Sequence, residues 1–511
     1  MRQVREFAGL FRYALPILLS AFLLFQIQPL IAKRILPWFG GTPALWTTCM
    51  LFFQALLLAG YVYSHILTRY TRAGRQALVH LTLLSLSLSQ LPVALPGPWK
   101  LAEAAAPTWG ILGLLAVSIG GPYLVLAATG PLLQSWLHRT HSGASPYRLY
   151  ALSNLGSLIA LLSYPFVLEP TVSLKNQSAL WSAGYAIFVA ACGWCAIRLL
   201  RSDAARAARV PQAERVTGTR PSAWDRLGWF TSAGCASVVL LATTNQVCQD
   251  VAVVPLLWVV PLALYLLSFV LTFGSERGYD RRVWGTLFLI FLGLGAATPF
   301  AGDHLPLVPK IAIDCALLFT ACMVCHGELV RRKPDPNHLT AFYLFVAAGG
   351  AGGGAFVTLL APSLFRFFAE FPLGLMASYL LFLTLLLRDP ASQLHRGRPV
   401  WAWAGLVVLG WLLGVAFFVS CGSSGDAMTA RSFYGIHRVV DVDPGGANWK
   451  RRFMHGSTLH GLQFVRDERR LLPLSYYGPQ SGIGLVLNHR SAGSQQGRRI
   501  GVLGLGVGTL A

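Results

Sequence analysis

The stretch from Arg12 to Ala32, RYALPILLSAFLLFQIQPLIA, determines the broad architecture of this chain. It is an apolar run of about 20 residues, which is the length that a helix needs to cross the hydrocarbon core of a bilayer. Comparable windows recur along most of the sequence. They lie near 12–32, 43–66, 77–96, 109–136, 149–168, 178–200, 228–248, 251–273, 283–300, 308–330, 339–361, 372–388 and 400–420. We therefore expect an all-α polytopic membrane bundle of about 12–13 transmembrane helices.

The composition supports this class. Of 511 residues, 54% are hydrophobic and 12% are charged, and the mean hydropathy is +0.55. Lys and Arg total 41 against 20 Asp and Glu, so the net charge is +21. A basic excess on an apolar chain is typical of cytoplasmic loops rather than of a nucleic-acid surface. We expect a multi-pass protein of the cell (inner or plasma) membrane, with the lipid bilayer as its partner, no nucleic acid and no metal site.

The distribution of basic residues predicts the topology. The loops after the even-numbered windows are rich in arginine, which places them and the N-terminus in the cytoplasm. These residues are Arg69, Arg72, Arg75, Arg139, Arg148, Arg277, Arg281, Arg282, Arg331, Arg332, Lys333, Arg388, Arg396 and Arg398, together with the arginines of 201–226. The linker 201–226 is the one long polar interruption. It divides the bundle into a first half at 1–200, with six windows, and a second half at 227–421, with six to seven.

The two halves share a short pattern. The window that opens with Tyr150 reaches Gly156, and the one that opens with Tyr343 reaches Gly349. Parallel six-helix repeats joined by a cytoplasmic linker are the plan of major-facilitator transporters, in which the substrate lies between the halves. The glycine run 349–354 contains GxxxG spacings, and we interpret it as a helix-packing surface.

Polar residues inside the windows are candidates for chemistry. Cys322 to His326 forms C-x-x-C-H, a haem-attachment pattern, but we favour packing cysteines, with His326 and Glu328 paired to the arginines that follow. Intramembrane carboxylates are costly, which makes Asp314 and Asp250 functional candidates. For the amides we favour hydrogen bonding between helices. They are Gln26, Gln28, Gln134, Asn154, Asn245 and Gln246.

After Cys421 the sequence becomes polar and its pattern changes. Short β-prone runs at 433–442, 457–465 and 483–488 are separated by Gly, Asp and Pro, which predicts small β-hairpins. The end of the chain, RRIGVLGLGVGTLA at 498–511, has the form of a buried strand followed by a glycine-rich turn. Such a turn lets a backbone approach a nucleotide at a helix N-terminus.

Several motifs together resemble one family. The tail contains RSFYGIHRV, FMHGSTLHGLQ, PLSYYGPQSGIG and RRIGVLGLGVGTLA, and the bundle contains QPLIAKRILPWFGGTPALW, PYRLYALSNLGSL and CHGELVRRKPDP. The chain is thereby similar to the fused major-facilitator-like/spermidine synthase family. The resemblance implies a β-hairpin subdomain at 422–497, the start of a Rossmann-type methyltransferase-like domain at 498–511, and polyamine aminopropyltransferase chemistry with decarboxylated S-adenosylmethionine or a related adenosyl-sulfonium donor.

The resemblance also implies roles for individual residues. Gln463 matches a glutamine beside the donor, and Tyr476 or Tyr477 lies near a tyrosine on the substrate side. His460 replaces an aspartate of the soluble enzymes. The nucleotide-binding glycines match Gly504, Gly506 and Gly508.

The acidic residue expected about 20 residues after the glycine turn and the aspartate that serves as general base both fall beyond Ala511. We therefore expect no catalytic residue in this chain and a catalytically incomplete enzyme, truncated or split, with a downstream-encoded polypeptide as the candidate partner that completes it. Two alternatives remain, a transporter of amines or related small solutes with a vestigial or regulatory tail, and a non-catalytic scaffold.

Thirteen spans place the tail outside, yet the donor is made in the cytosol. One false span would remove this conflict, so we expect a cytoplasmic tail.

Overall fold

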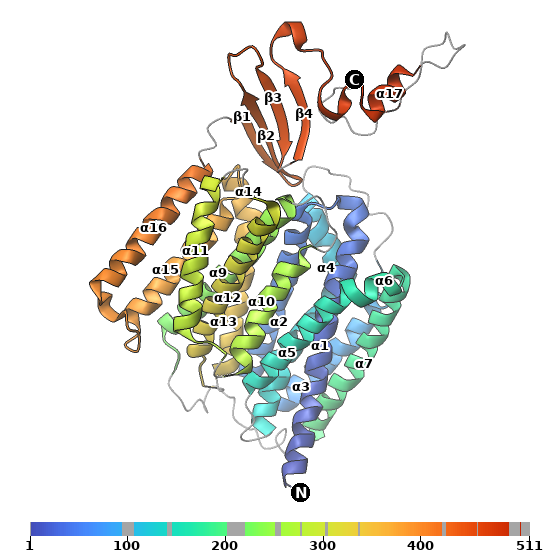
Figure 1. Ribbon diagram of the computed structural model, residues 1–511. Coiled ribbons are helices and arrows are strands. Elements are labelled where there is room, and N and C mark those ends of the chain that lie inside the picture. Colours follow the sequence, from blue (N-terminus) through green and yellow to red (C-terminus); the bar gives the residue numbers. More distant parts are fainter. Residues whose placement is uncertain are drawn as a thin grey trace.

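A computed structural model describes residues 2–94, 107–140, 146–201, 220–250, 257–275, 278–301, 305–335, 338–421, 426–456, 458–489 and 501. It is a helical bundle with a small sheet at one end (Figure 1). The first half contains α1 (Arg2–Phe39), α2 (Pro43–Tyr70), α3 (Ala73–Ser87), α4 (Pro107–Thr140), α5 (Pro146–Ser163), α6 (Glu169–Thr171) and α7 (Leu174–Arg201). The second half contains α9 (Ala223–Asp250), α10 (Val259–Gly274), α11 (Arg281–Ala301), α12 (Leu307–Arg331), α13 (Leu339–Ala355), α14 (Ala361–Leu364), α15 (Glu370–Arg388) and α16 (Val400–Cys421).

Each of the thirteen apolar windows contains a helix. Within the described residues, 11 helical stretches are long and apolar enough to cross a membrane. The other two windows contain α3, with 15 residues, and α10, with 16 residues. The expectation of a multi-pass helical membrane protein is confirmed, and its count is corrected to 11 full-length candidates.

The bundle has two chemically different ends. The N-terminus lies at one end, and the sheet lies at the other (Figure 1). We call the first the arginine-rich end, because α2, α7, α12 and α15 finish there with Arg69, Arg201, Arg331 and Arg388. We call the other the sheet end. Since loops rich in Lys and Arg stay in the cytoplasm, the sheet is expected to face the exported side, contrary to our expectation of a cytoplasmic tail.

The tail forms a four-stranded antiparallel sheet in the order β1-β2-β3-β4. Its strands are β1 (Asp426–Ser432), β2 (Gly435–Val442), β3 (Lys450–His455) and β4 (Thr458–Phe464). Two of the three predicted β-prone runs are thus confirmed as strands. The third is wrong: Gly482–Asn488 forms helix α17, because the side chain of Ser481 accepts a hydrogen bond from the Gly484 N–H and caps its first turn. Apart from Gly501, the predicted Rossmann start lies outside the described residues.

The glycine run packs α13 against α9. A Cβ atom at Gly349 would collide with the Phe230 carbonyl oxygen, and one at Gly353 would lie 2.6 Å from the Gly234 oxygen. The two backbones therefore approach too closely for any larger residue. The helix-packing interpretation is confirmed for these two positions.

The repeated pattern of the two halves has a counterpart in the backbone. The helix that begins with α5 continues into a π-helical segment, η2 (Tyr164–Leu168), and α13 continues into another, η6 (Phe356–Leu360). Across the halves, α2 packs against α13 and α5 against α10. The two repeated tyrosines, Tyr150 and Tyr343, stack at this contact with ring centroids 4.8 Å apart.

Candidate functional site

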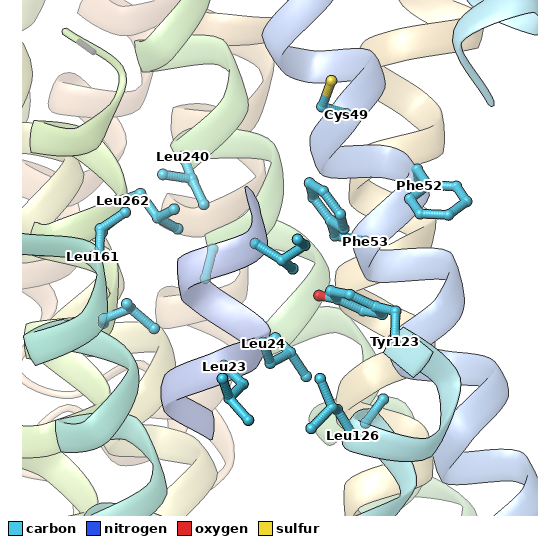
Figure 2. Close-up of a cluster of buried hydrophobic side chains, with 14 of the residues drawn as sticks. Leu23, Leu24, Cys49, Phe52, Phe53, Tyr123, Leu126, Leu161, Leu240 and Leu262 are labelled. Atoms are coloured by element: carbon cyan, nitrogen blue, oxygen red, sulfur yellow. The ribbon is translucent and has the colours of Figure 1, made fainter. Parts of the chain in front are cut away.

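A cavity of about 160 Å³ lies between the two halves. Helices α1, α2, α4 and α5 of the first half and α9, α10 and α13 of the second contribute its walls. Figure 2 shows part of the apolar shell around it, with Leu24 from α1, Phe53 from α2, Tyr123 from α4 and Leu240 from α9 converging on one region. Both halves therefore contact anything held there.

The polar lining is neutral. It consists of the amides Gln28, Gln54 and Asn154, the tyrosines Tyr61, Tyr123, Tyr150 and Tyr265, and the serines Ser20, Ser153 and Ser157. No Asp, Glu, Lys, Arg or His belongs to the part of this lining that the structure describes. The cavity recognises its occupant through hydrogen bonds and aromatic faces rather than through a fixed charge.

Five of these ten groups donate a hydrogen within the protein. The Ser20 hydroxyl donates to the Ile17 carbonyl oxygen at 2.8 Å, and the Ser157 hydroxyl donates to Ser153 O at 3.1 Å. Asn154 Nδ2 donates to Tyr150 O at 2.9 Å. The same side chains keep lone pairs on their oxygen atoms. Because each amide also has a second N–H and the tyrosine hydroxyls can donate as well as accept, the wall offers the cavity both donors and acceptors.

Gln28 shows this most clearly. Its Nε2 donates to the Tyr123 hydroxyl at 3.3 Å, while its Oε1 is buried without a hydrogen-bond partner among the described residues. Gln54 is held from the other half: its Nε2 donates to Ser237 Oγ at 2.9 Å. Because the Ser237 hydroxyl itself donates to the Gly350 oxygen, the Gln54 amide nitrogen, not its oxygen, must face Ser237.

An aromatic layer separates the cavity from the arginine-rich end. Besides stacking on Tyr343, the Tyr150 ring meets two rings edge-on, with centroid separations of 4.8 Å for Phe273 and 5.9 Å for Phe269. The ring centroids of Tyr61 and Tyr343 are 6.1 Å apart. Since Tyr61 and Tyr150 belong to the first half and the other rings to the second, this layer joins the halves. At the sheet end, Trp46 stacks on Trp258 across the halves at 5.4 Å.

The candidate residues of α12 do not reach the cavity. Glu328 pairs with Arg281 of α11 at 2.6 Å and accepts a hydrogen bond from the Tyr279 hydroxyl. The prediction that it pairs with the following arginines is therefore wrong, because the α12 turn directs it toward α11. His326 is fully buried, and its Nδ1 contacts Ser268 Oγ at 2.7 Å.

Two other carboxylates have different outcomes. Asp314 is buried in α12, but it does not line the cavity. The side chain of Asp250 lies outside the described residues. A third carboxylate, Glu370, was missed by the sequence analysis. It is fully buried and pairs at 2.7 Å with Arg431 of the sheet.

The Arg431 and Glu370 pair fastens the sheet to the second half. Arg431 also donates to the Phe367 carbonyl oxygen at 2.9 Å and lies over the Phe368 ring at 4.7 Å. Asn245 of α9 donates to Glu370 Oε1 at 3.3 Å. The sheet is therefore anchored by a buried, hydrogen-bonded charge pair on helices of one half only.

The predicted site residues of the tail are partly brought together. Tyr476 and Tyr477 lie in the short helix η9 (Ser475–Tyr477), and the Tyr476 hydroxyl donates to the His460 carbonyl oxygen at 2.7 Å. Gln463 is exposed on β4 and donates to Arg470 O at 3.5 Å. Tyr476 is 48% exposed, so these groups alone do not enclose an adenosyl donor. Gly504, Gly506 and Gly508 lie outside the described residues.

One face of the sheet carries three histidines. His437 and His455 stack at 4.7 Å, and His455 lies 5.8 Å from His460. Burial lowers the pKa of His437, and the neighbouring His455 and His460 lower it further. Within the described residues, no group of three or more His, Cys, Asp or Glu side chains is arranged to hold a metal ion.

No protein-family model matches the chain, and no curated protein matches it. Solved structures with a similar chain path include the major facilitator superfamily proton:xylose symporter XylE bound to 6-bromo-6-deoxy-D-glucose. That match has 12% identity and a TM-score of 0.42, and it covers 81% of this chain and 95% of that one. The human organic anion transporter MFSD10 (TETRAN) matches with 13% identity and a TM-score of 0.43, over 81% of this chain and 99% of that one. These similarities assign no family.

Proposed function

We propose that this protein is a membrane transporter of small solutes with a major-facilitator-like plan, located in the cell (inner or plasma) membrane. The observation that supports this proposal best is the cavity walled by four helices of one half and three of the other. A site shared by two halves is the arrangement that alternating access requires, because rocking of the halves then exposes the site to each side in turn.

The ends of the cavity support the same function. Aromatic rings from both halves meet between the cavity and the arginine-rich end, and the Trp46 and Trp258 pair joins the halves toward the sheet end. Contacts between rings contribute about 0.5–1.5 kcal/mol each beyond their buried area. Such contacts are weak enough to separate during a transport cycle. They act as two gates in series on one path.

Transport is testable before the solute is known. Purified protein is reconstituted into vesicles, exposed to an isotope-labelled extract of small metabolites, and the vesicle contents are identified by mass spectrometry. Gly350 lines the cavity, and a Cβ atom there meets nothing within 4 Å. Gly350→Phe should therefore fill the cavity and abolish uptake.

The matched control is Gly414→Phe in α16, where a Cβ atom also meets nothing within 4 Å. This control should take up the same solutes as the unsubstituted protein. Both variants must keep the elution volume and the thermal unfolding midpoint of the parent. If no solute distinguishes the parent from Gly350→Phe, the transport proposal fails.

We also propose, for the tail, an aminopropyltransferase-like surface that binds decarboxylated S-adenosylmethionine around Gln463. Formation of the sheet in the predicted region supports it, as does the contact between Tyr476 and His460. The position of the sheet opposite the arginine-rich end weighs against a cytosolic donor. Calorimetric titration of the purified protein with this donor tests it; no heat of binding with or without a candidate partner polypeptide would contradict it.

A further inference from the structure

We propose that the cavity binds a small, uncharged solute with hydroxyl groups, such as a short polyol, and rejects amines and carboxylates. This inference rests on the transport proposal and specifies its substrate class. It replaces the expectation of an amine substrate.

The first argument is the cost of burying a charge. Removing an ion from water costs several kcal/mol even after relaxation of the protein. The described lining offers no Asp or Glu to an amine and no Lys or Arg to a carboxylate. The face of a tyrosine ring attracts a desolvated cation by about 2 kcal/mol or more, but the described lining supplies no carboxylate to offset the rest of that cost.

The second argument is the polarity of the hydrogen-bonding groups. Ser20, Ser157 and Asn154 donate to main-chain carbonyl oxygens, and Gln28 donates to Tyr123. The second N–H of each amide and the tyrosine hydroxyls remain available beside the oxygen lone pairs. The lining therefore offers both donors and acceptors, all of them neutral. An occupant with hydroxyl groups, which both donate and accept, matches this lining without bringing a charge into it.

The third argument is size. A cavity of about 160 Å³ is close to the ~150 Å³ engineered cavity that holds one benzene molecule. In this conformation the site therefore admits a compact solute of about that size. Aromatic rings beside neutral acceptors complete a site suited to alternating C–H and O–H surfaces.

The experiment uses the full chain in phosphatidylethanolamine and phosphatidylglycerol vesicles with three labelled probes of similar size: erythritol, putrescine and glycerate. We expect uptake of erythritol that Gly350→Phe abolishes, and no such uptake of the other two. Uptake of putrescine or glycerate without erythritol, if blocked by Gly350→Phe, would overturn the solute class while leaving the transport proposal intact. No blocked uptake of any probe also overturns the solute class, and the metabolite experiment then decides separately whether the protein transports.

Variants of Gln28 test the role of its oxygen. Gln28→Leu should raise the half-saturation concentration for erythritol about 3- to 10-fold, as expected for one neutral hydrogen bond. Gln28→Glu supplies the missing negative charge and should permit putrescine uptake. The control is Thr48→Val, which removes another buried, unpartnered oxygen outside the cavity lining and should change neither value. Equal effects of Gln28→Leu and Thr48→Val would contradict the proposed contact.

Discussion

The helices within the first half of the bundle are held together by different chemistry from those within the second half. In the first half, buried neutral groups join the helices: Gln26 of α1 donates to Ala160 O and Ser163 Oγ, and Trp136 of α4 donates to Gln76 of α3. The ion pair that joins Lys33 to Glu169 in this half is partly exposed, at 33% and 26%. In the second half, the Arg281 and Glu328 pair is 12% and 1% exposed.

This difference indicates a division of roles. Neutral hydrogen bonds between membrane helices contribute about 0.6 kcal/mol each on average. The stability of the first half therefore depends on many small contributions. Buried charge pairs are strongly destabilising to break, because one charge remains uncompensated. The second half has such pairs at both of its ends. At the arginine-rich end, Arg281 of α11 pairs with Glu328 of α12 and with Asp389, the residue after α15. At the sheet end, Glu370 pairs with Arg431 and anchors the sheet.

The largest effect is expected from Glu328→Leu. It removes the buried partner of Arg281, which then keeps only the partly exposed Asp389, and it removes the acceptor of Tyr279. The free energy of unfolding should fall by about 3 kcal/mol, the lower end of the range for a broken buried pair. Steric trapping in bicelles measures this quantity. The control is Arg282→Leu, an exposed neighbour, with an expected change within about 0.5 kcal/mol.

The double variant Arg281→Leu/Glu328→Leu sharpens this prediction. Removing both charges leaves Asp389 paired with Arg331 and only Tyr279 without its acceptor, so the cost of the double variant should be less than the sum of the two single costs. Additive costs would show that the pair is not coupled, and the contrast between the halves would then lose its main support.

The next effect is expected at the sheet. Glu370→Leu removes the buried partner of Arg431, and should weaken docking by about 2 kcal/mol, the lower end of the range for truncating a buried charge pair at an interface. Because an undocked Arg431 is solvated, the bundle should remain folded. The population of undocked sheet should rise about 30-fold, measured as the rate of trypsin cleavage at Arg438 and Arg452 in the opened state.

The exchange of both charges, Glu370→Arg with Arg431→Glu, provides the matched test. It should recover part of the protection from trypsin, whereas Glu370→Arg alone should not. Equal cleavage of the parent and Glu370→Leu would show that this pair does not hold the sheet.

A smaller effect is expected in the first half. Gln26→Leu removes two hydrogen bonds between α1 and the end of α5, and should cost about 0.6–1.7 kcal/mol by the same unfolding measurement. Thr82→Val is the control, since its hydroxyl bonds only within its own helix, to Leu78 O. A cost for Gln26→Leu as large as that for Glu328→Leu would remove the difference between the halves.

The sequence predicted what depends on local pattern. Apolar length located the long helices of the bundle, and the glycine spacing at Gly349 and Gly353 predicted close packing. The β-prone runs predicted β2 and β4 of the tail, but not β1 and β3. It failed where a competing local signal was stronger: Ser481 caps a helix in a segment whose apolar residues had suggested a strand.

The cavity and the ion pairs were predicted less well. Gln28 and Asn154 were recognised as buried polar groups, but Tyr61, Tyr123, Tyr265 and Gly350 gave no signal, because facing a cavity depends on how helices far apart in sequence are rotated. The predicted partner of Glu328 was wrong for the same reason. Proximity along the chain favoured the arginines that follow, whereas the fold supplies Arg281 from another helix. One useful signal was missed. Glu370 begins α15, and Arg431 lies in the strand that follows α16, so the two charges flank the last two long helices.

The smallest predicted effect is a pH dependence of the stability of the sheet, which arises at the face that carries His437. Because the pKa of His437 is lowered in the folded state, the unfolded strand binds more protons as the pH falls. The contribution of neutral His437 to the stability of the folded sheet is therefore complete above the ordinary histidine pKa of about 6.5. It is lost as the pH falls through the lower pKa of the folded state. Amide exchange, corrected for intrinsic rates, should show weaker protection of β2 at about pH 5.5 than at about pH 7.5, with α9 unchanged. His437→Phe preserves a ring against Phe453, which His437 stacks on at 5.6 Å, and should reduce this difference. An undiminished difference in His437→Phe would assign the acid sensitivity to His455 or His460 instead.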